Sequence, residues 1–168
     1  VVCSVEAAMQ LTVPREVLKR KSAGITHDSE ISPERVVDAL ISAGYVRADM
    51  VEGKGQFARR GAIIDMFPPD CDYPVRIEFW GDSVDSMAYF DPISQRRREN
   101  AEKIKITPAT EVIFDSDEIL SEKIKKLASS LRGKNITKVR ESLLSDADKL
   151  DSNVRIGCTD RYLPLAYE

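Results

Sequence analysis

The sequence has one histidine and three cysteines, which excludes several kinds of functional site. Because His27 is the only histidine, a metal site with several histidine ligands is impossible, and a nucleophilic triad would have to use this one residue. Cys3, Cys71 and Cys158 lie far apart and form no Cys-x-x-Cys motif, so we expect reduced cysteines rather than a disulfide framework or a zinc site. The sequence therefore predicts no metal and no cofactor.

Long hydrophobic runs and an excess of charge of one sign are also absent. No run approaches the roughly 20 apolar residues of a membrane helix, and no leader opens the chain, so we expect a cytoplasmic protein without a membrane partner. The 25 Lys and Arg residues nearly balance the 28 Asp and Glu residues, which gives no global indication of a nucleic-acid surface.

The Gly-Lys pairs at 53–54 and 133–134 lack the flanking residues of a P-loop, the phosphate-binding motif of many nucleotide-binding proteins. With 168 residues, 42% of them hydrophobic, the chain can bury a globular core.

Both ends of the chain predict a segment of a larger protein. Val1-Val2-Cys3-Ser4 predicts a short buried strand, followed by a helical turn from Glu6 to Met9. The last residues place large hydrophobic side chains where polar ones are usual: Tyr162, Leu163, Leu165 and Tyr167. We expect a surface outside this segment to cover them.

Hydrophobic periodicity predicts one helix and several strands in the first two thirds of the chain. Ser32, followed by Pro33, is typical of a helix N-cap, and the apolar stripe behind it predicts a helix over 33–43. Short β-rich runs over 57–90, separated by turn residues, predict an antiparallel meander. A further strand is expected at 104–106.

Helical periodicity returns after Thr107. One helix is predicted from a cap at Asp115 or Ser116 to Gly133, and the apolar stripe of a second one contains Val139, Leu143, Ala147 and Leu150. We interpret the change near Thr107 as a domain boundary. The predicted fold class is α/β of the mixed α+β kind, with a small antiparallel or mixed β-sheet domain and flanking helices inserted into a partly present α/β domain.

The run VRIEFW at residues 75–80 is the most informative stretch. Alternation along a strand would divide it between two faces, with Val75, Ile77 and Phe79 in the core and Arg76, Glu78 and Trp80 opposite. An exposed Trp beside an Arg is typical of a protein-binding hot spot. In the alternative interpretation Trp80 packs against a second layer, and alternation alone favours this alternative, since mixed sheets are often covered on both sides.

Two short basic segments are further candidates. In Arg59-Arg60-Gly61, the glycine suggests a β-bulge or a close backbone approach, which would turn an arginine side chain outward. The local sequence favours the alternative, in which the two arginines are solvated at the start of a strand. The run Arg96-Arg97-Arg98 could contact phosphates. Because Glu99 and Glu102 flank this run, a solvated loop is favoured.

Paired carboxylates are the only candidates for acid-base chemistry. The pairs are Asp82 with Asp85 and Asp115 with Asp117. Without a histidine or a metal cluster beside them, we interpret them as turn and cap residues. The sequence therefore predicts no catalytic residue.

The run MVEGKGQFARRGAIIDMFPPDCDYPVRIEFWGDSVDSMAYFDPISQRR, from Met50 to Arg97, resembles a known family. It is similar, without gaps, to the UvrB-like region of transcription-repair coupling factors. The upstream GYVRADMV, the downstream ITPATE and the final LPLAYE are similar to the same family, so the resemblance covers essentially the whole chain. UvrB shares several elements, but the VEGKGQFA segment and the helices after ITPATE are closer to the coupling factors.

The resemblance implies a function that composition could not show. In that family a motor clears RNA polymerase stalled at damage, and the UvrB-like module recruits UvrA. It implies that residues 1–21 end one α/β domain, 22–106 form the UvrA-binding domain, and 107–168 return to the first domain. It also implies contacts with RNA polymerase and DNA only through the translocase and polymerase-binding parts of the larger protein, and we expect this segment to be monomeric.

The family's UvrA-binding residues fall on Arg60, Arg76 and Trp80. Trp80 stands where the family usually has phenylalanine, and Ala62 where a second glycine is common. We expect Arg60 and Arg76 to have guanidinium groups that are free to bind carboxylates of the partner.

The sequence leaves three hypotheses about function, each from a different class. The first is a protein-protein adaptor that binds UvrA through Arg60, Arg76 and Trp80. The second is a nucleic-acid-binding module that depends on Arg96 to Arg98 and on low salt. The third is an enzyme fragment, for which the sequence offers no convergent set of residues.

Overall fold

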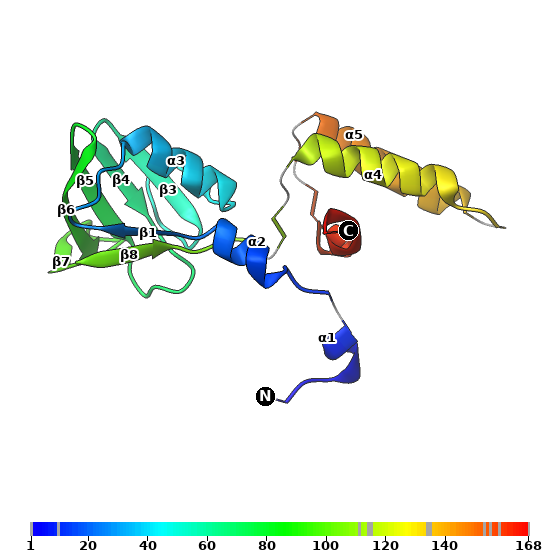
Figure 1. Cartoon of the computed structure of the whole chain (residues 1–168), viewed down its shortest axis with the longest axis horizontal. Coiled ribbons are helices and arrows are strands. Elements are labelled where there is room, and N and C mark those ends of the chain that lie inside the picture. The colour runs from blue at the N-terminus through cyan, green and yellow to red at the C-terminus, as the bar shows by residue number, and fades with distance from the viewer. Residues whose placement is uncertain are drawn as a thin grey trace. The chain divides into compact units, whose positions relative to one another are not determined.

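A computed structural model describes residues 2–9, 11–110, 112–113, 116–133, 136–152, 154, 156–157 and 159–167. The chain divides into two units, one formed by residues 14–113 and the other by residues 1–13 with 114–168. We call them the sheet unit and the helical unit; Figure 1 shows the elements of each. The domain division predicted from the sequence, with boundaries at 22 and 107, stays a prediction about the larger protein.

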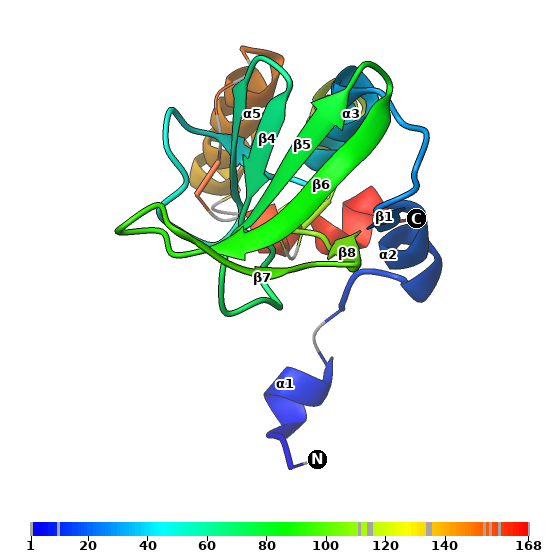
Figure 2. The same ribbon diagram turned by 90° about the vertical axis from the view of Figure 1, so that its left-hand side faces the viewer.

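A six-stranded sheet is the framework of the sheet unit. Its order is β2-β3-β4-β5-β6-β7, in which β2 runs parallel to β3 and every other neighbouring pair is antiparallel. The strands are β2 (Val46–Arg47), β3 (Gln56–Arg60), β4 (Ile63–Met66), β5 (Val75–Trp80), β6 (Ser83–Phe90) and β7 (Arg97–Asn100). The predicted meander is therefore confirmed, and Figure 2 shows β4, β5 and β6 side by side.

Gly61 forms the turn between β3 and β4. The two strands pair without a register shift, from Arg60 opposite Ile63 onward, so the predicted bulge is wrong. The φ angle of Gly61 is +63°, and a Cβ there would meet nothing within 4 Å. The turn conformation, and not a close backbone approach, therefore requires glycine at this position.

One face of the sheet packs against helix α3 (Pro33–Ser42) and buries the main core. Ser32 caps this helix, because its side chain accepts a hydrogen bond from the backbone N–H of Arg35; the predicted helix and its cap are confirmed. Strand β5 contributes its alternate residues to this core, as predicted. The core includes Val36, Leu40, Phe57, Ile64, Met66, Val75, Ile77 and Phe79. We call this side of the sheet the core face.

A two-stranded antiparallel sheet of β1 (Ala23–Thr26) and β8 (Lys103–Ile106) completes the same core. Ile25, Ile104 and Ile106 are buried in it, so the strand predicted at 104–106 is confirmed. Helix α2 (Arg15–Arg20) precedes β1.

The opposite face of the six-stranded sheet buries a smaller apolar cluster of Val51, Ala58, Phe67 and Phe90. Asp65, on β4, is buried with an exposed fraction of 2%. Because neighbouring residues of a strand point to opposite faces, Asp65 lies on this side, away from Ile64 and Met66 of the core. We call this side the polar face.

The helical unit is built on the pair α4 (Asp117–Ser130) and α5 (Thr137–Asp151). Both predicted helices are confirmed, although α4 ends before Gly133. Ser116 caps α4 by accepting the backbone N–H of Ile119; the alternative cap, Asp115, lies outside the described residues. The unit also contains α1 (Val5–Met9), the 3-10 helix η1 (Thr159–Tyr162) and α6 (Leu163–Ala166). Its core contains Leu120, Ile124, Ala147, Leu150 and Tyr162.

Several expectations for this unit are wrong. Val2, Cys3 and Ser4 form no strand and are exposed, whereas the helical turn after them is confirmed. Tyr162 needs no outside surface, because it is buried and its hydroxyl donates to Asp146 at 2.7 Å.

Two further details of the helical unit concern single residues. Leu165 packs against the core cluster of its own unit, so it too is partly covered from within. Val139 is largely exposed rather than part of the buried stripe of α5. Val1 and Cys158 lie outside the described residues.

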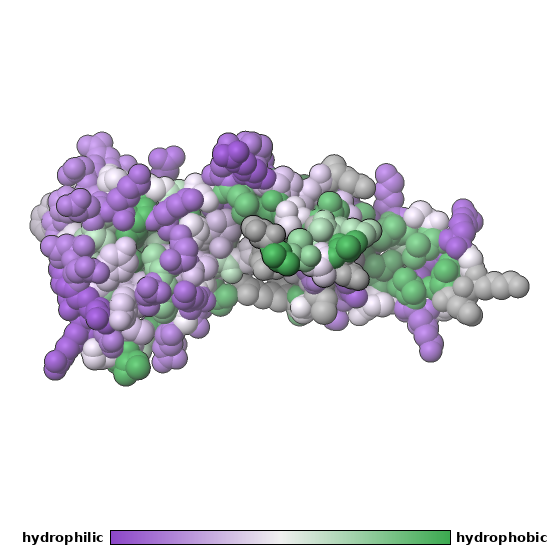
Figure 3. All heavy atoms as spheres, turned by 90° about the horizontal axis from the view of Figure 1, so that it is seen from below, coloured by the Kyte–Doolittle hydropathy of each residue, from purple (hydrophilic) through white to green (hydrophobic). Residues whose placement is uncertain are grey.

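Hydrophilic side chains dominate the sheet unit in the view of Figure 3, whereas more hydrophobic side chains are visible on the helical unit. The large exposed apolar residues of the helical unit agree with this view: Val2, Val5, Met9, Leu11, Ile119, Val139, Leu144 and Val154. Of the helices in the described part of the chain, none has both the length and the apolar character that crossing a bilayer requires.

Candidate functional site

Trp80 is the most exposed large aromatic side chain of the described sheet, with an exposed fraction of 83%. Its neighbour Phe79 belongs to the core and is only 6% exposed. The interpretation in which a second layer covers Trp80 is therefore wrong. Trp80 is the last residue of β5 and directly precedes the turn at Gly81, so it lies at the end of a hairpin, where no described element packs over it.

A buried carboxylate connects the two predicted arginines on the polar face. Arg60 donates from Nη2 to Oδ2 of Asp65 at 2.5 Å. Arg76 donates from Nε to Oδ1 at 2.7 Å and from Nη2 to Oδ2 at 2.9 Å, which is the bidentate geometry of strong Arg-carboxylate pairs. We call Arg60, Asp65 and Arg76 the Arg-Asp-Arg cluster.

The expectation that both guanidinium groups are free is therefore wrong. Asp65 lies directly opposite Arg76 in the register of β4 and β5, and a buried carboxylate without a partner would be strongly unfavourable. The hydrogen bonds to Asp65 raise the pKa of Arg76 above its usual value. The cluster nevertheless has an excess of one positive charge.

Arg76 is held more firmly than Arg60. Its Nη2 also donates to Oε1 of Gln95 at 3.2 Å, and its guanidinium lies 4.7 Å from the centroid of the Phe90 ring. Accordingly the Arg76 side chain is 24% exposed and that of Arg60 is 49% exposed. Arg60 thus presents more of its charge to solvent, whereas Arg76 has a fixed orientation.

Sequence reasoning did not single out Asp65. The available signal was a carboxylate inside the otherwise apolar run IIDM, residues 63–66. An acidic residue in such a strand is almost never buried without a partner. The partner could not be identified from sequence, because it depends on the register of β3, β4 and β5.

Arg59 does not belong to this cluster. Its guanidinium donates to the Glu34 carboxylate of α3, on the core side of the sheet. This hydrogen bond lowers the pKa of Glu34. Arg59 and Arg60 therefore point to opposite faces, as consecutive residues of a strand must.

The basic run Arg96-Arg97-Arg98 lies at and within β7, so the predicted solvated loop is wrong for its last two residues, although all three are exposed. Arg97 donates to Oδ1 of Asn100 at 2.9 Å. Arg98 lies 3.9 Å from the centroid of the Tyr73 ring and 3.9 Å from a carboxylate oxygen of Asp91. Two of the three arginines are thus engaged locally.

The carboxylate pairs do not converge into an acid-base site. Asp82 lies in the turn after β5, as predicted, and Asp117 is in the first turn of α4. Asp85 lies in β6 rather than in a turn, next to an irregularity in its pairing with β5. Asp115 is outside the described residues. Among the residues that the structure describes, no three His, Cys, Asp or Glu side chains gather as a metal site.

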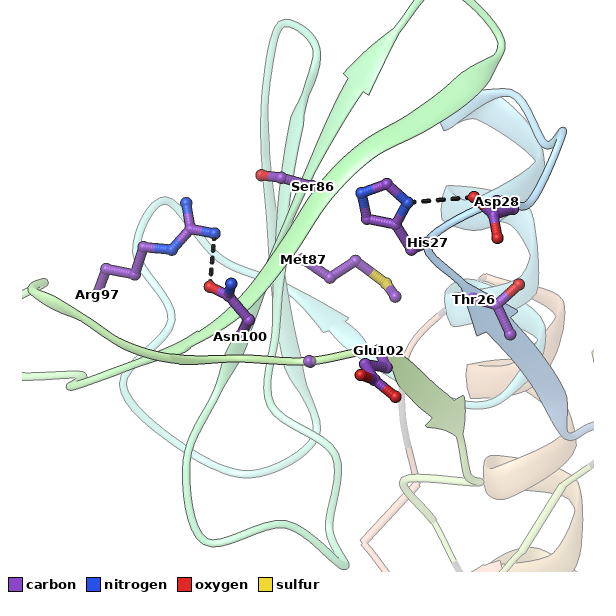
Figure 4. A pocket seen from close by; sticks show the side chains of 9 residues that line it. Thr26, His27, Asp28, Ser86, Met87, Arg97, Asn100 and Glu102 are labelled. Carbon is purple, nitrogen blue, oxygen red and sulfur yellow. Dashed lines mark hydrogen bonds and ion pairs between the residues drawn. The ribbon is translucent and has the colours of Figure 1, made fainter.

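A cavity of about 560 Å³ lies between β6, β7 and the segment that follows β1. Figure 4 shows His27 and Asp28 on one side of it and Arg97 with Asn100 on the other. Nδ1 of His27 is 3.3 Å from Oδ1 of Asp28, and both side chains are largely exposed. A water-accessible pair of this kind, without a nucleophile beside it, forms no recognisable catalytic arrangement.

Comparisons with known proteins agree with the resemblance seen in the sequence. A family described as the UvrB interaction domain matches residues 24–112. The transcription-repair-coupling factor of Bacillus subtilis (strain 168) is 35% identical over all of this chain, which spans 15% of that protein. That of Escherichia coli (strain K12) is 35% identical over 66% of the chain and 10% of the relative. The UvrABC system protein B of Gloeothece citriformis is 31% identical over 71% of the chain and 18% of the relative.

Proposed function

Because the chain belongs to the UvrB interaction domain family, we propose that it is an adaptor that binds UvrA through the polar face of its sheet. In a transcription-repair coupling factor, such a segment would recruit UvrA to RNA polymerase stalled at DNA damage, as a step of nucleotide excision repair. The segment acts by binding and not by catalysis. The ATP-driven translocation and the contacts with polymerase and DNA belong to other parts of the larger protein.

The exposure of Trp80 on the strand that also carries Arg76 is the observation that supports this proposal most. A tryptophan that is 83% exposed offers a large apolar surface to a partner. Fixed guanidinium groups on the same face add directional hydrogen bonds. Trp and Arg together are the residue types enriched in protein-binding hot spots.

The electrostatics of the polar face define the kind of partner surface. Asp65 neutralises one of the two arginines, which leaves one net positive charge in the Arg-Asp-Arg cluster. A carboxylate of the partner can accept from donors that Asp65 does not occupy. We therefore expect the contacting surface of UvrA to carry acidic side chains beside an apolar area that covers Trp80.

Titration calorimetry of the chain against UvrA tests the proposal. Arg76→Ala is expected to weaken binding by about 2 kcal/mol, or about 30-fold, which is the usual threshold of a hot-spot residue. Arg76→Lys should recover only part of this, because an ammonium lacks the planar fork that holds Asp65 and the partner together. Each variant must first show a native circular dichroism spectrum.

Trp80→Ala should cause a loss of similar size through lost apolar contact. Its effect on affinity should depend less on salt than that of the arginine variants, because screening acts on charges. If UvrA binds Arg76→Ala and Trp80→Ala as tightly as the unchanged chain, the polar face is not the binding site.

Arg35→Ala is the matched control. Arg35 is exposed on α3, which packs on the core face, so its loss should leave UvrA affinity unchanged. Duplex DNA, titrated at several salt concentrations, tests the alternative of a nucleic-acid-binding module. DNA binding that weakens steeply with salt and is lost in Arg96→Ala, without UvrA binding, would replace the adaptor function by that alternative.

A further inference from the structure

A notch of about 60 Å³ adjoins the Arg-Asp-Arg cluster on the polar face. It lies across three strands, with Arg76 on β5, Ala88 on β6 and Arg97 near Ala88 on β7. Ala88 pairs with Arg76 on one side and with Asn100 on the other. Arg97 pairs with Phe90, whose ring also lies against the Arg76 guanidinium. The small side chain of Ala88 is part of the lining. The other residues around the notch are Glu78, Ser86, Tyr89 and Phe90.

Both arginines of the notch keep hydrogen-bond donors available. A guanidinium has five N–H groups. Among the described residues, Arg76 uses three of them, two on Asp65 and one on Gln95, so both N–H groups of its Nη1 have no protein acceptor there. Arg97 uses one, on Asn100.

The acidic residue of the notch is already engaged. Glu78 accepts the Ser86 hydroxyl at 2.9 Å. In Figure 4, Ser86 and Arg97 lie on the same side of β6, while Met87 points to the other side, toward His27. Counted together with the Arg-Asp-Arg cluster that it adjoins, the notch has three guanidinium groups, of Arg60, Arg76 and Arg97, and two carboxylates, of Asp65 and Glu78, so the net charge is +1.

We propose that this notch binds an acidic side chain, Asp or Glu, of the partner protein, and that Arg97 is a binding residue together with Arg76. The proposal rests on the function proposed above and adds a subsite to it. The small volume admits a carboxyl group but not an aromatic ring, and two guanidinium groups favour an anion over a cation. Arg97 belongs to the basic run Arg96–Arg98. The proposal adds it to the binding surface of Arg60, Arg76 and Trp80.

Calorimetric titration of UvrA into the full chain tests the subsite. Arg97→Ala should weaken binding about tenfold, the value of one charge-assisted hydrogen bond. Arg97→Lys should restore the affinity in part, to within about threefold of the unchanged chain, since it keeps the charge but not the fork. The control for the loss of one positive charge is Arg35→Ala, which should bind normally.

Glu78→Gln tests the sign of the charge that enters the notch. If an acidic side chain binds there, removing the Glu78 charge relieves repulsion and should tighten binding by about threefold. If a basic side chain binds there, the same change weakens binding, and the proposal is wrong. Asp38→Asn, at an exposed position of α3, is the control for the change in net charge and should leave the affinity unchanged.

The outcomes separate the subsite from the function on which it rests. Loss of affinity in Arg76→Ala and Trp80→Ala together with normal binding by Arg97→Ala would overturn the subsite and leave the adaptor function intact. If the unchanged chain does not bind UvrA, both are overturned. Weaker binding by Arg97→Ala with tighter binding by Glu78→Gln supports the subsite.

Discussion

The two faces of the six-stranded sheet are stabilised in different ways. On the core face, large apolar side chains from six strands, β1, β3, β4, β5, β6 and β8, and from α3 pack into one continuous cluster. On the polar face, four apolar residues form a small cluster, and Arg60, Asp65 and Arg76 interact with one another beside it. Each core residue contributes by its own burial, whereas each charged residue of the polar face depends on the presence of its partner.

Together with the proposed function, this difference predicts that stability depends mainly on the core face and that recognition depends on the polar face. Burial on the core face removes apolar area from water and requires no directional contact. On the polar face, the protein holds charged groups in fixed orientations and leaves Trp80 uncovered. Four substitutions, taken from the largest expected effect to the smallest, test this prediction.

Phe79→Ala should have the largest effect. Phe79 is 6% exposed in the main core, and its truncation is expected to lower the free energy of unfolding by about 3 to 5 kcal/mol through lost burial and a cavity. Urea denaturation followed by circular dichroism measures this. A loss below about 0.5 kcal/mol, the size usual at surface positions, would show that the core face does not dominate stability.

Asp65→Asn should have an intermediate effect. The variant keeps the volume of the side chain but removes the charge that holds two arginines, one of them half exposed. We expect a loss of about 2 kcal/mol in the free energy of unfolding, below the range for fully buried pairs, because water can solvate Arg60. The double variant with Arg76→Ala should be less destabilised than the sum of the two single variants. Strict additivity would contradict the coupling of these residues.

Tyr45→Phe tests a polar group on the core face. Tyr45 is 3% exposed, and within the described part of the chain its hydroxyl has no hydrogen bond of ordinary geometry, although Thr107 lies near enough to affect its pKa. Removing that hydroxyl should stabilise the chain by about 1 kcal/mol at neutral pH. A destabilised Tyr45→Phe variant would indicate that this hydroxyl has a partner after all.

The same residue predicts a dependence on pH. Burial raises the pKa of Tyr45 above its usual value, so the folded protein keeps the hydroxyl neutral when the unfolded chain ionises it near pH 10. Its contribution to stability is therefore complete below pH about 10 and falls above it by up to about 1.4 kcal/mol per pH unit. Denaturation at pH about 9 and about 11 should show the advantage of Tyr45→Phe increasing with pH.

Trp80→Ala should have the smallest effect on stability. Because the side chain is 83% exposed, the free energy of unfolding should change by less than about 0.5 kcal/mol. The same variant should lose UvrA affinity, so stability and binding would be separated at one residue. Thermal unfolding of Phe79→Ala and Trp80→Ala in parallel gives the comparison. Equal destabilisation would mean that Trp80 belongs to a core.

Local sequence was sufficient for most of the secondary structure. The Ser32 cap followed by Pro33 defined the start of α3, and alternation in residues 75–80 assigned the faces of β5 correctly. These features depend on backbone preferences and on the period of side chains along a strand, which are properties of neighbouring residues. Arg60, Arg76 and Trp80 could also be identified as candidates, although only the family resemblance distinguished Arg60 from Arg59.

Only the tertiary structure decided how the charged residues pair. Asp65 meets Arg60 and Arg76 because the register of three strands brings them together. Arg97 lines the same notch as Arg76 because β7 pairs with β6 and brings Arg97 opposite Phe90, whose ring lies against Arg76. Tyr162, which the sequence placed at an uncovered end, is buried in the apolar core of the helical unit, where its hydroxyl donates to Asp146 on α5. Alternation and helical periodicity determine which face a residue occupies, but they carry no information about the residue opposite. Hydrogen bonds and ion pairs require contact within a few ångströms, and that contact exists only once the strands and helices have paired.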